Sequence, residues 1–257
     1  MKKYSAVRSV VALPPSQKKC MAPEIMTKQL ALGFILPEKA TLESYVLAAN
    51  EQAVADMSAN AKGRGEQFIY LWGATQTGKS HLLQAATEIA DKANRSAVYI
   101  PLDQAKQFSP DIFDDLEQMD LVCLDGIEQI AGVPQWEQGL FNLFNRIREL
   151  HHSLLVAADC SPLNLPIMLP DLSSRMSWGL CYQLQPLNDQ EKIEALTKDA
   201  CRRGMEISEE TAHYILRHTQ RDMGSLRQLL EQLDKASLEA QRRLTIPFIR
   251  GFLQQRP

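Results

Sequence analysis

The chain has 257 residues, of which 45% are hydrophobic and 23% are charged, and its formal net charge at pH 7 is −3. This composition is typical of a globular protein, the length allows one large core and a smaller domain, and the slight negative charge argues against a dedicated DNA-binding protein. No apolar run is long enough to span a membrane and no secretory signal opens the chain, so we expect a cytoplasmic protein without a membrane segment.

The first 40 residues are predicted to form a flexible N-terminal arm. They contain several prolines and sustain neither a helical nor a strand period. Within the arm, residues 29–34 offer apolar side chains that can fill pockets on another protein and a glutamine that can make a polar anchor. The same stretch can instead fold back onto the chain's own domain. The candidate docking residues are Gln29, Leu30, Leu32 and Phe34.

From Thr41 the apolar residues recur at helical spacing, which predicts a helix that continues toward Met57. Residues 73–80 then read G-x-x-x-x-G-K-S, the complete P-loop pattern. An apolar strand is predicted before this pattern, over 68–72, and a helix after it, over 80–90. Strand, glycine loop and helix form the context in which backbone N–H groups converge on phosphate oxygens.

The P-loop therefore predicts a site for ADP, ATP or another nucleoside diphosphate, with magnesium. Lys79 would reach the terminal phosphates, and the Ser80 hydroxyl would bind Mg²⁺. A chance glycine turn is the bland alternative, and the matching strand and helix argue against it. The candidate nucleotide-binding residues are Gly73, Ala74, Thr75, Gln76, Thr77, Gly78, Lys79, Ser80 and His81.

Four further apolar runs alternate with helical stretches, at 97–101, 121–124, 153–157 and 180–184. Short continuous apolar strands between helices indicate a parallel sheet that is covered on both faces, so the predicted fold class is α/β. After Leu187 only helical patterns follow, and they predict a small all-helical lid. We therefore expect an arm over 1–40, a nucleotide-binding α/β domain over 41–187 and a lid domain over 188–257.

Asp125 ends the apolar run 121–124, which is the form of a Walker B strand whose acid holds Mg²⁺ directly or through water. An aspartate that merely caps a turn is the common alternative. Gly126 stands where many such ATPases place a second acid to orient the attacking water, and Glu128 is out of register for that role. The sequence therefore predicts weak hydrolysis by this chain alone.

Three later residues are candidates for contact with phosphates. Asp159 follows the strand at 153–157 and can contact a γ-phosphate or the attacking water, or can simply shape a loop. Arg175 lies on a predicted helix, from which a guanidinium can reach a phosphate bound by another subunit; alternatively it pairs with Asp171. Arg227 opens a lid helix and can bend back over the nucleotide, although a lone arginine is usually solvated.

The P-loop, the Walker B strand, the Ser-Arg-x-x-Trp-Gly segment at 174–179 and the late lid arginine together resemble the AAA+ ATPases. Within them the chain is most similar to the DnaA family of replication initiators, through residues 70–73, 171–179 and 244–249. The resemblance spans roughly residues 41–253. It implies that Arg175 is an arginine finger acting in trans, that Asp159 is sensor 1 and that Arg227 is sensor 2. It also implies base contacts by Tyr45 and Val46.

Three features depart from the family pattern. The sequence ends after the lid, where an initiator continues into a helix-turn-helix domain. The connection over 102–120 is short, and Gly126 replaces the second acid. We therefore expect a family member that retains the nucleotide module and lacks sequence-specific DNA binding.

Residues 29–34 are similar to the peptide that docks into the sliding clamp, the beta subunit of DNA polymerase III. With a DnaA-like module, this resembles a branch of the family that acts with the DNA-loaded clamp. The resemblance implies stimulation of hydrolysis of DnaA-bound ATP, which prevents re-initiation, and association with the nucleoid through the clamp. It implies DnaA, the clamp and further copies of this chain as partners. An autonomous AAA+ ATPase, such as a helicase loader or an initiator-like factor, is the alternative.

Overall fold

A computed structural model describes residues 40–107, 109–240 and 242–254. The candidate docking residues Gln29, Leu30, Leu32 and Phe34 lie outside these ranges. Within them, none of the helices combines the length and the apolar character needed to cross a bilayer.

The centre of the structure is a five-stranded parallel sheet with the strand order β2-β3-β4-β1-β5. Each strand coincides with one of the predicted apolar runs, and the α/β fold class is confirmed. The strands β3, β4 and β1 are parallel neighbours in this order, so their carboxyl ends meet at one edge of the sheet. The strands are β1 (Phe68–Trp72), β2 (Ala97–Pro101), β3 (Leu121–Asp125), β4 (Ser153–Ala158) and β5 (Leu180–Gln183).

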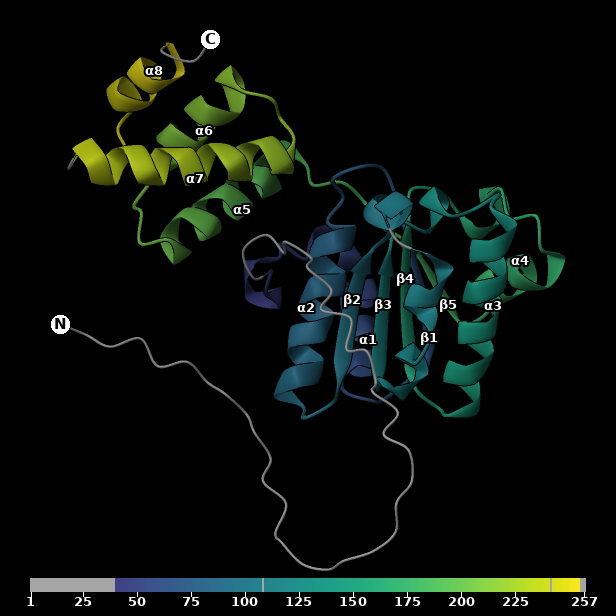
Figure 1. The fold of residues 1–257 in the computed structure, drawn as a ribbon. Helices are drawn as coiled ribbons and strands as arrows, with labels where there is room; N and C mark the ends of the chain where they lie inside the picture. Colours follow the sequence, from purple (N-terminus) through teal and green to yellow (C-terminus); the bar gives the residue numbers. More distant parts are fainter. Residues whose placement is uncertain (1–39, 108, 241, 255–257) are drawn as a thin grey trace, which may run out of the picture. The chain divides into compact units, whose positions relative to one another are not determined.

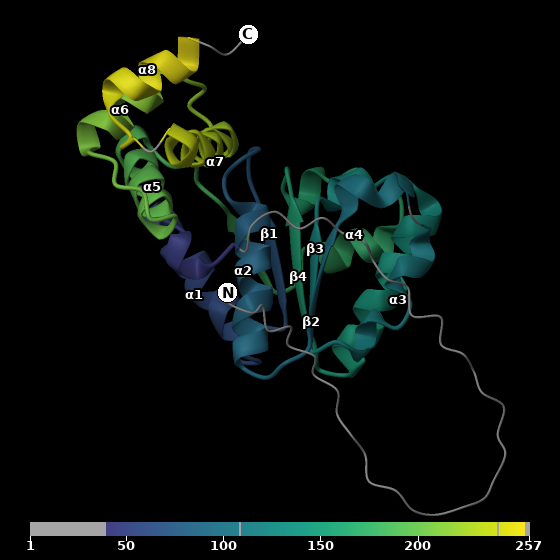
Figure 2. The same ribbon diagram turned by 60° about the vertical axis from the view of Figure 1, so that its left-hand side comes forward.

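Helices cover both faces of the sheet (Figures 1 and 2). The helices α1 (Glu51–Ala61) and α2 (Lys79–Lys92) lie on one face, and α3 (Pro134–Glu149) and α4 (Pro170–Met176) lie on the other. All six residues of β4 are buried, which explains why this strand reads as an unbroken apolar run. Each face of the sheet therefore packs against its own pair of helices.

Four helices after the sheet form their own hydrophobic core (Figure 1). They are α5 (Asp189–Arg202), α6 (Glu209–His218), α7 (Met223–Ala240) and α8 (Ile246–Gln254). A capping box begins α5: Asn188 Oδ1 accepts from the Glu191 N–H at 2.9 Å, and Glu191 Oε2 accepts from the Asn188 N–H at 2.7 Å. The predicted helical lid is confirmed.

The helix predicted from Thr41 is wrong in its first part, because the α-helix begins only at Glu51. Two separate 3-10 turns, Leu42–Ser44 and Ala48–Asn50, precede it. Ala48 has a left-handed backbone (φ 44°), which interrupts the helical path. The apolar spacing in this segment therefore reflects packing of a bent chain against α1 and α2.

Residues 41–50, here called the bent segment, contact the chain that follows β5 through the side chain of Asn50. Its Nδ2 donates to the Tyr45 hydroxyl at 3.2 Å and to the Gln185 carbonyl at 3.1 Å. Its Oδ1 accepts from the Gln185 N–H at 2.8 Å. Contacts across 135 residues of sequence thus override the local helical preference.

Candidate functional site

The P-loop connects β1 to α2, as the strand–loop–helix context requires. Two of its glycines are needed for close approach. A Cβ at Gly78, whose φ is +92°, would lie 2.7 Å from Cε2 of Tyr45, and a Cβ at Gly73 would lie 2.8 Å from the Leu184 carbonyl oxygen. The loop is therefore packed against the bent segment on one side and against the end of β5 on the other.

Lys79 is the loop's cation, and it folds back onto the loop. Its Nζ donates to the carbonyl oxygens of Gly73 at 2.7 Å and Ala74 at 3.0 Å, positions from which it can turn toward a phosphate. Burial lowers the pKa of Lys79, and nearby carboxylates oppose this shift. These carboxylates are Asp125, Glu128 and Asp159. The structure thus brings the predicted acids and the P-loop lysine to the same edge of the sheet.

The predicted magnesium ligands, Ser80 and Asp125, are linked by Tyr99 on the neighbouring strand β2. The Tyr99 hydroxyl donates to Asp125 Oδ2 at 2.7 Å and also interacts with the side chains of Ser80 and Gln84. Burial and the Asp125 charge raise the pKa of Tyr99, so its hydroxyl stays a donor. One hydroxyl and one carboxylate fit Mg²⁺, which commonly takes one or two protein oxygens beside phosphates and water.

Glu128 is out of register for the second acid along the sequence, but the fold brings it into the site. Gly126 has a left-handed backbone (φ +81°), and the chain turns through the 3-10 segment Ile127–Gln129. Glu128 Oε2 then accepts from the Asp159 N–H at 3.3 Å. A carboxylate therefore lies beside Asp159 although position 126 has none. An acid two residues after a turn-forming glycine is the signal that could have indicated it.

The residues expected to contact the base are buried around the P-loop. Tyr45 is 9% exposed, its hydroxyl lies 3.5 Å from the Thr77 carbonyl oxygen, and burial raises its pKa to about 12. Val46 is also buried and lines a groove with Glu191 and Lys198 of α5. The structure thus places Tyr45 beneath the loop and Val46 beside the lid.

His81 is buried at the start of α2 and ties this helix to the bent segment. Its Nε2 lies 2.8 Å from the Thr41 carbonyl oxygen and 3.2 Å from Ser44 Oγ. Burial, reinforced by the charge of Arg227, lowers the pKa of His81 to about 4. His81 is therefore neutral at physiological pH, and its Nε2–H donates to Thr41.

Arg227 lies at the start of α7 and lines a polar pocket of about 300 Å³ together with Ser80 and His81. Burial lowers the pKa of its guanidinium, and the nearby Asp199 carboxylate opposes this shift. Asp199 is itself buried and accepts from Arg202 Nη2 at 2.9 Å. The structure thus brings the predicted sensor 2 arginine to the Ser80 end of α2.

Arg175 lies on α4, on the other face of the sheet from α2 (Figure 2). Its Cζ lies 4.1 Å from the ring centroid of Phe141, and its Nη1 is buried without a hydrogen-bond partner among the described residues. In the same ranges no ion pair joins it to Asp171, the bland alternative. The structure therefore separates Arg175 from the chain's own P-loop.

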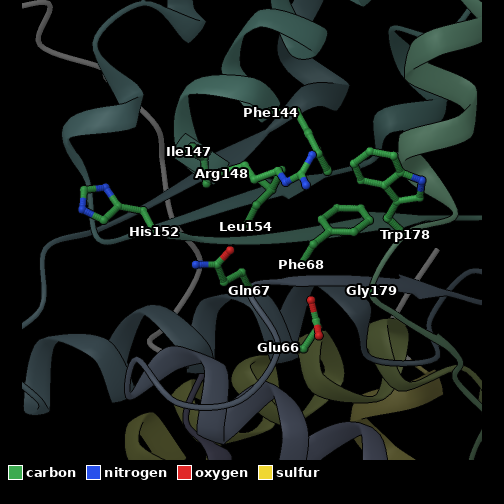
Figure 3. Close-up of a pocket in the computed structure, with 10 residues that line it drawn as sticks. All are labelled: Glu66, Gln67, Phe68, Phe144, Ile147, Arg148, His152, Leu154, Trp178 and Gly179. Atoms are coloured by element: carbon green, nitrogen blue, oxygen red, sulfur yellow. The ribbon is translucent and has the colours of Figure 1, made fainter. Parts of the chain in front are cut away.

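Two of the aromatic residues near Arg175, Phe144 and Trp178, also line a small pocket (Figure 3). Two arginines lie near the Trp178 ring, with Arg148 Cζ at 4.8 Å and Arg175 Cζ at 5.8 Å from its centroid. Phe68, Phe144 and Trp178 line this pocket of about 70 Å³, and Trp178 is 41% exposed. Exposed tryptophan and arginine together are typical of protein interfaces.

Two family models match the chain. The model described as the bacterial DnaA ATPase domain matches residues 36–183, and the one described as the Hda lid domain matches residues 189–253. An uncharacterized protein of Haemophilus influenzae is 42% identical over 229 residues, which cover 89% of this chain and 99% of that protein.

Solved structures with the same fold include initiators and a motor. Domain III of the Thermotoga maritima replication initiation protein DnaA has a TM-score of 0.70 and 20% identity, covering 82% of this chain and 94% of that one. AMPPCP-bound DnaA from Aquifex aeolicus has a TM-score of 0.61 and 22% identity, covering 75% and 64%. The T. maritima RuvB branch migration motor has a TM-score of 0.63 and 14% identity, covering 84% and 71%. At these identities the likeness concerns the fold.

Proposed function

Because this chain belongs to the DnaA family of AAA+ nucleotide-binding proteins and carries a lid domain of the Hda type, we propose that it is a regulator of DnaA. In this proposal it acts with the DNA-loaded sliding clamp. It stimulates hydrolysis of the ATP that DnaA holds, and it thereby prevents re-initiation of chromosome replication.

The observation that carries the proposal is the position of Arg175. Its guanidinium packs on aromatic rings of α3, on the other face of the sheet from the helix that follows the chain's own P-loop. One of its nitrogens is buried without a hydrogen-bond partner in the described ranges. In this proposal the side chain turns out from the aromatic rings, and a phosphate oxygen of the partner then accepts from that nitrogen. An arginine finger acting in trans accelerates phosphoryl transfer by about 10³–10⁵-fold.

The chain's own nucleotide site has the character of a switch in this proposal. The P-loop, Ser80 and Asp125 would hold ADP or ATP with Mg²⁺, and Asp159 and Arg227 would report on the phosphates as sensors 1 and 2. Magnesium, when bound, neutralises phosphate charge, and Tyr99 orients the Asp125 carboxylate beside Ser80. Gly126 leaves the strand end without the usual second acid, so we expect slow intrinsic turnover.

The clamp would act as a tether. Binding through Gln29, Leu30, Leu32 and Phe34 would concentrate the protein on DNA near its partner, at the nucleoid in the cytoplasm, without sequence-specific DNA contacts. Self-association into a dimer or a larger assembly is also part of the proposal, because AAA+ fingers act across subunit boundaries.

The test is a measurement of ATP hydrolysis by DnaA in the presence of clamp loaded on DNA. We expect the parent protein to stimulate hydrolysis by DnaA. With Arg175→Ala the stimulated rate should fall about 10³-fold or return to the unstimulated rate, because an arginine finger supplies an acceleration of about that size. Nucleotide binding by the variant, measured by calorimetry, should be unchanged.

The matched control for this test is Arg64→Ala, which removes an exposed arginine from the loop before β1. It should stimulate like the parent. Full stimulation by Arg175→Ala would overturn the finger role. Rapid hydrolysis by this chain alone would favour the second candidate, an autonomous AAA+ ATPase, which Glu128 beside Asp159 makes chemically reasonable.

A further inference from the structure

Glu137 is a buried carboxylate that the nucleotide chemistry does not use. It lies in α3 and is 2% exposed. Its Oε1 accepts from the Gly132 N–H at 2.7 Å, its Oε2 accepts from the Leu169 N–H at 2.8 Å, and the Met168 N–H reaches both oxygens at 3.0 Å. Burying a carboxylate is unfavourable unless hydrogen bonds replace its hydration. These backbone donors supply that replacement.

Two of the three donors stand at the entrance to α4. Leu169 is the N-cap residue of this short helix, and its side chain makes no capping hydrogen bond. The Leu169 carbonyl accepts from the Ser173 N–H at 3.0 Å, so this residue belongs to the first turn. The chain over 165–169 forms neither helix nor strand. A carboxylate from another helix therefore fixes the point at which α4 begins.

The same face of α3 also meets the far end of α4. Phe141 and Phe144 follow Glu137 at i+4 and i+7, which puts all three on one side of the helix. Arg175, six residues after the N-cap of α4, places its Cζ 4.1 Å from the Phe141 ring and 5.7 Å from the Phe144 ring. One stripe of α3 thus holds α4 at its beginning and supports the arginine at its end.

We propose that Glu137 is a positioning residue for Arg175. By holding the N–H groups of Met168 and Leu169, it sets the start of α4 and with it the direction in which the guanidinium leaves the helix. The inference rests on the proposed function, since it takes Arg175 as the group that acts on the partner's ATP. A misplacement of about 1 Å in such a group can cost about 100-fold in rate.

The experiment is a titration of the partner ATPase with Glu137→Gln, using the full chain and clamp on DNA. The substitution replaces one acceptor oxygen with an NH₂ group that opposes the backbone donors. We expect the maximal stimulated rate to fall about tenfold or more, while the half-saturating concentration stays unchanged. Glu149→Gln, an exposed glutamate of the same helix, is the matched control and should behave like the parent.

Two further measurements separate positioning from folding. Hydrogen exchange should accelerate at Met168 and Leu169 and remain unchanged in β1 and α2. Glu137→Asp retains the charge with a shorter reach, so it serves if Glu137→Gln does not fold, and its maximal rate should fall as well. A raised half-saturating concentration with the parent's maximal rate would mean a purely structural role and would overturn the proposal.

Arg175→Ala makes the two proposals distinguishable. If the parent itself gives no stimulation, the proposed function fails. If Arg175→Ala stimulates like the parent, the finger role of Arg175 fails, and the positioning role of Glu137 fails with it. If Arg175→Ala loses stimulation while Glu137→Gln keeps the parent's maximal rate, only the positioning role is overturned. If Glu137 acts through Arg175, the double variant should be no slower than Arg175→Ala alone.

Discussion

At the carboxyl edge of the sheet, single side chains decide what chemistry the nucleotide site can perform. Asp125 is held by Tyr99, and Asp159 donates its N–H to Glu128. Glu128 lies in a 3-10 turn after Gly126, and its spacing from Asp125 alone does not indicate that it reaches the site. A carboxylate beside Asp159, the predicted sensor 1 residue, can orient an attacking water or accept its proton, so Glu128 is a candidate base for the intrinsic ATP hydrolysis of this chain.

We predict that Glu128→Gln lowers intrinsic ATP hydrolysis by at least about tenfold, because an amide is a poor proton acceptor. Single-turnover hydrolysis of labelled ATP measures the rate, and nucleotide affinity should be retained. Glu51→Gln, at an exposed position of α1, is the control. An unchanged rate in Glu128→Gln would leave Glu128 with a role only in holding the Asp159 backbone.

Between elements, the most important contact is the one that His81, at the start of α2, makes with the bent segment. His81 donates from Nε2 to the Thr41 carbonyl, and its ring lies 5.6 Å from that of Tyr45. Asn50 closes the other side through Tyr45 and Gln185. Because Tyr45 in turn packs on Gly78, the P-loop, the bent segment and the end of the sheet form one connected unit.

The buried His81 in this contact predicts that the free energy of unfolding depends on pH. The pKa of His81 is lowered to about 4 in the folded chain, against about 6.5 when unfolded, so the unfolded state binds the proton more readily. The contribution of neutral His81 to the free energy of unfolding is complete above pH 6.5 and is lost as the pH falls toward 4. Between pH 7.5 and 5 the loss is up to about 2 kcal/mol.

Urea unfolding at pH 7.5 and at pH 5 measures this loss, and His81→Gln is the comparison, since its amide can still donate to Thr41. The variant should lose less stability on acidification than the parent by up to about 2 kcal/mol. Equal losses in the two proteins would show that His81 does not titrate in this window.

For the whole molecule, the sheet separates the P-loop helix from the helix that carries Arg175. The nucleotide site lies at the start of α2, and Arg175 lies on α4 on the other face of the sheet (Figure 2). Arg175, the proposed finger, therefore lies on the other face of the sheet from the helix that follows the chain's own P-loop, as the proposed activation of another ATPase requires. The division into an arm over 1–40, a nucleotide domain over 41–187 and a lid over 188–257 stays a prediction.

The arm carries the prediction that belongs to this scale. Alanine at Gln29, Leu32 and Phe34 should abolish capture of this protein by immobilised sliding clamp, because two apolar anchors and one polar contact are removed together. ATP binding should persist, since the P-loop is untouched. Alanine at Val10, Val11 and Leu13 is the control within the same arm. Undiminished capture of the first variant would place the clamp contact elsewhere.

The sequence by itself determined the strands, the P-loop and the family, because each depends on local spacing: continuous apolar runs, glycines at set intervals and the helix that follows. It also indicated Asp125, Asp159, Arg175 and Arg227. Only the tertiary structure decided that residues 41–50 bend, that Glu128 reaches Asp159, and that Glu137 holds the start of α4. Each of these rests on a hydrogen bond between segments far apart in the chain, or on a left-handed turn that redirects a side chain, and neither leaves a periodic signal in the sequence.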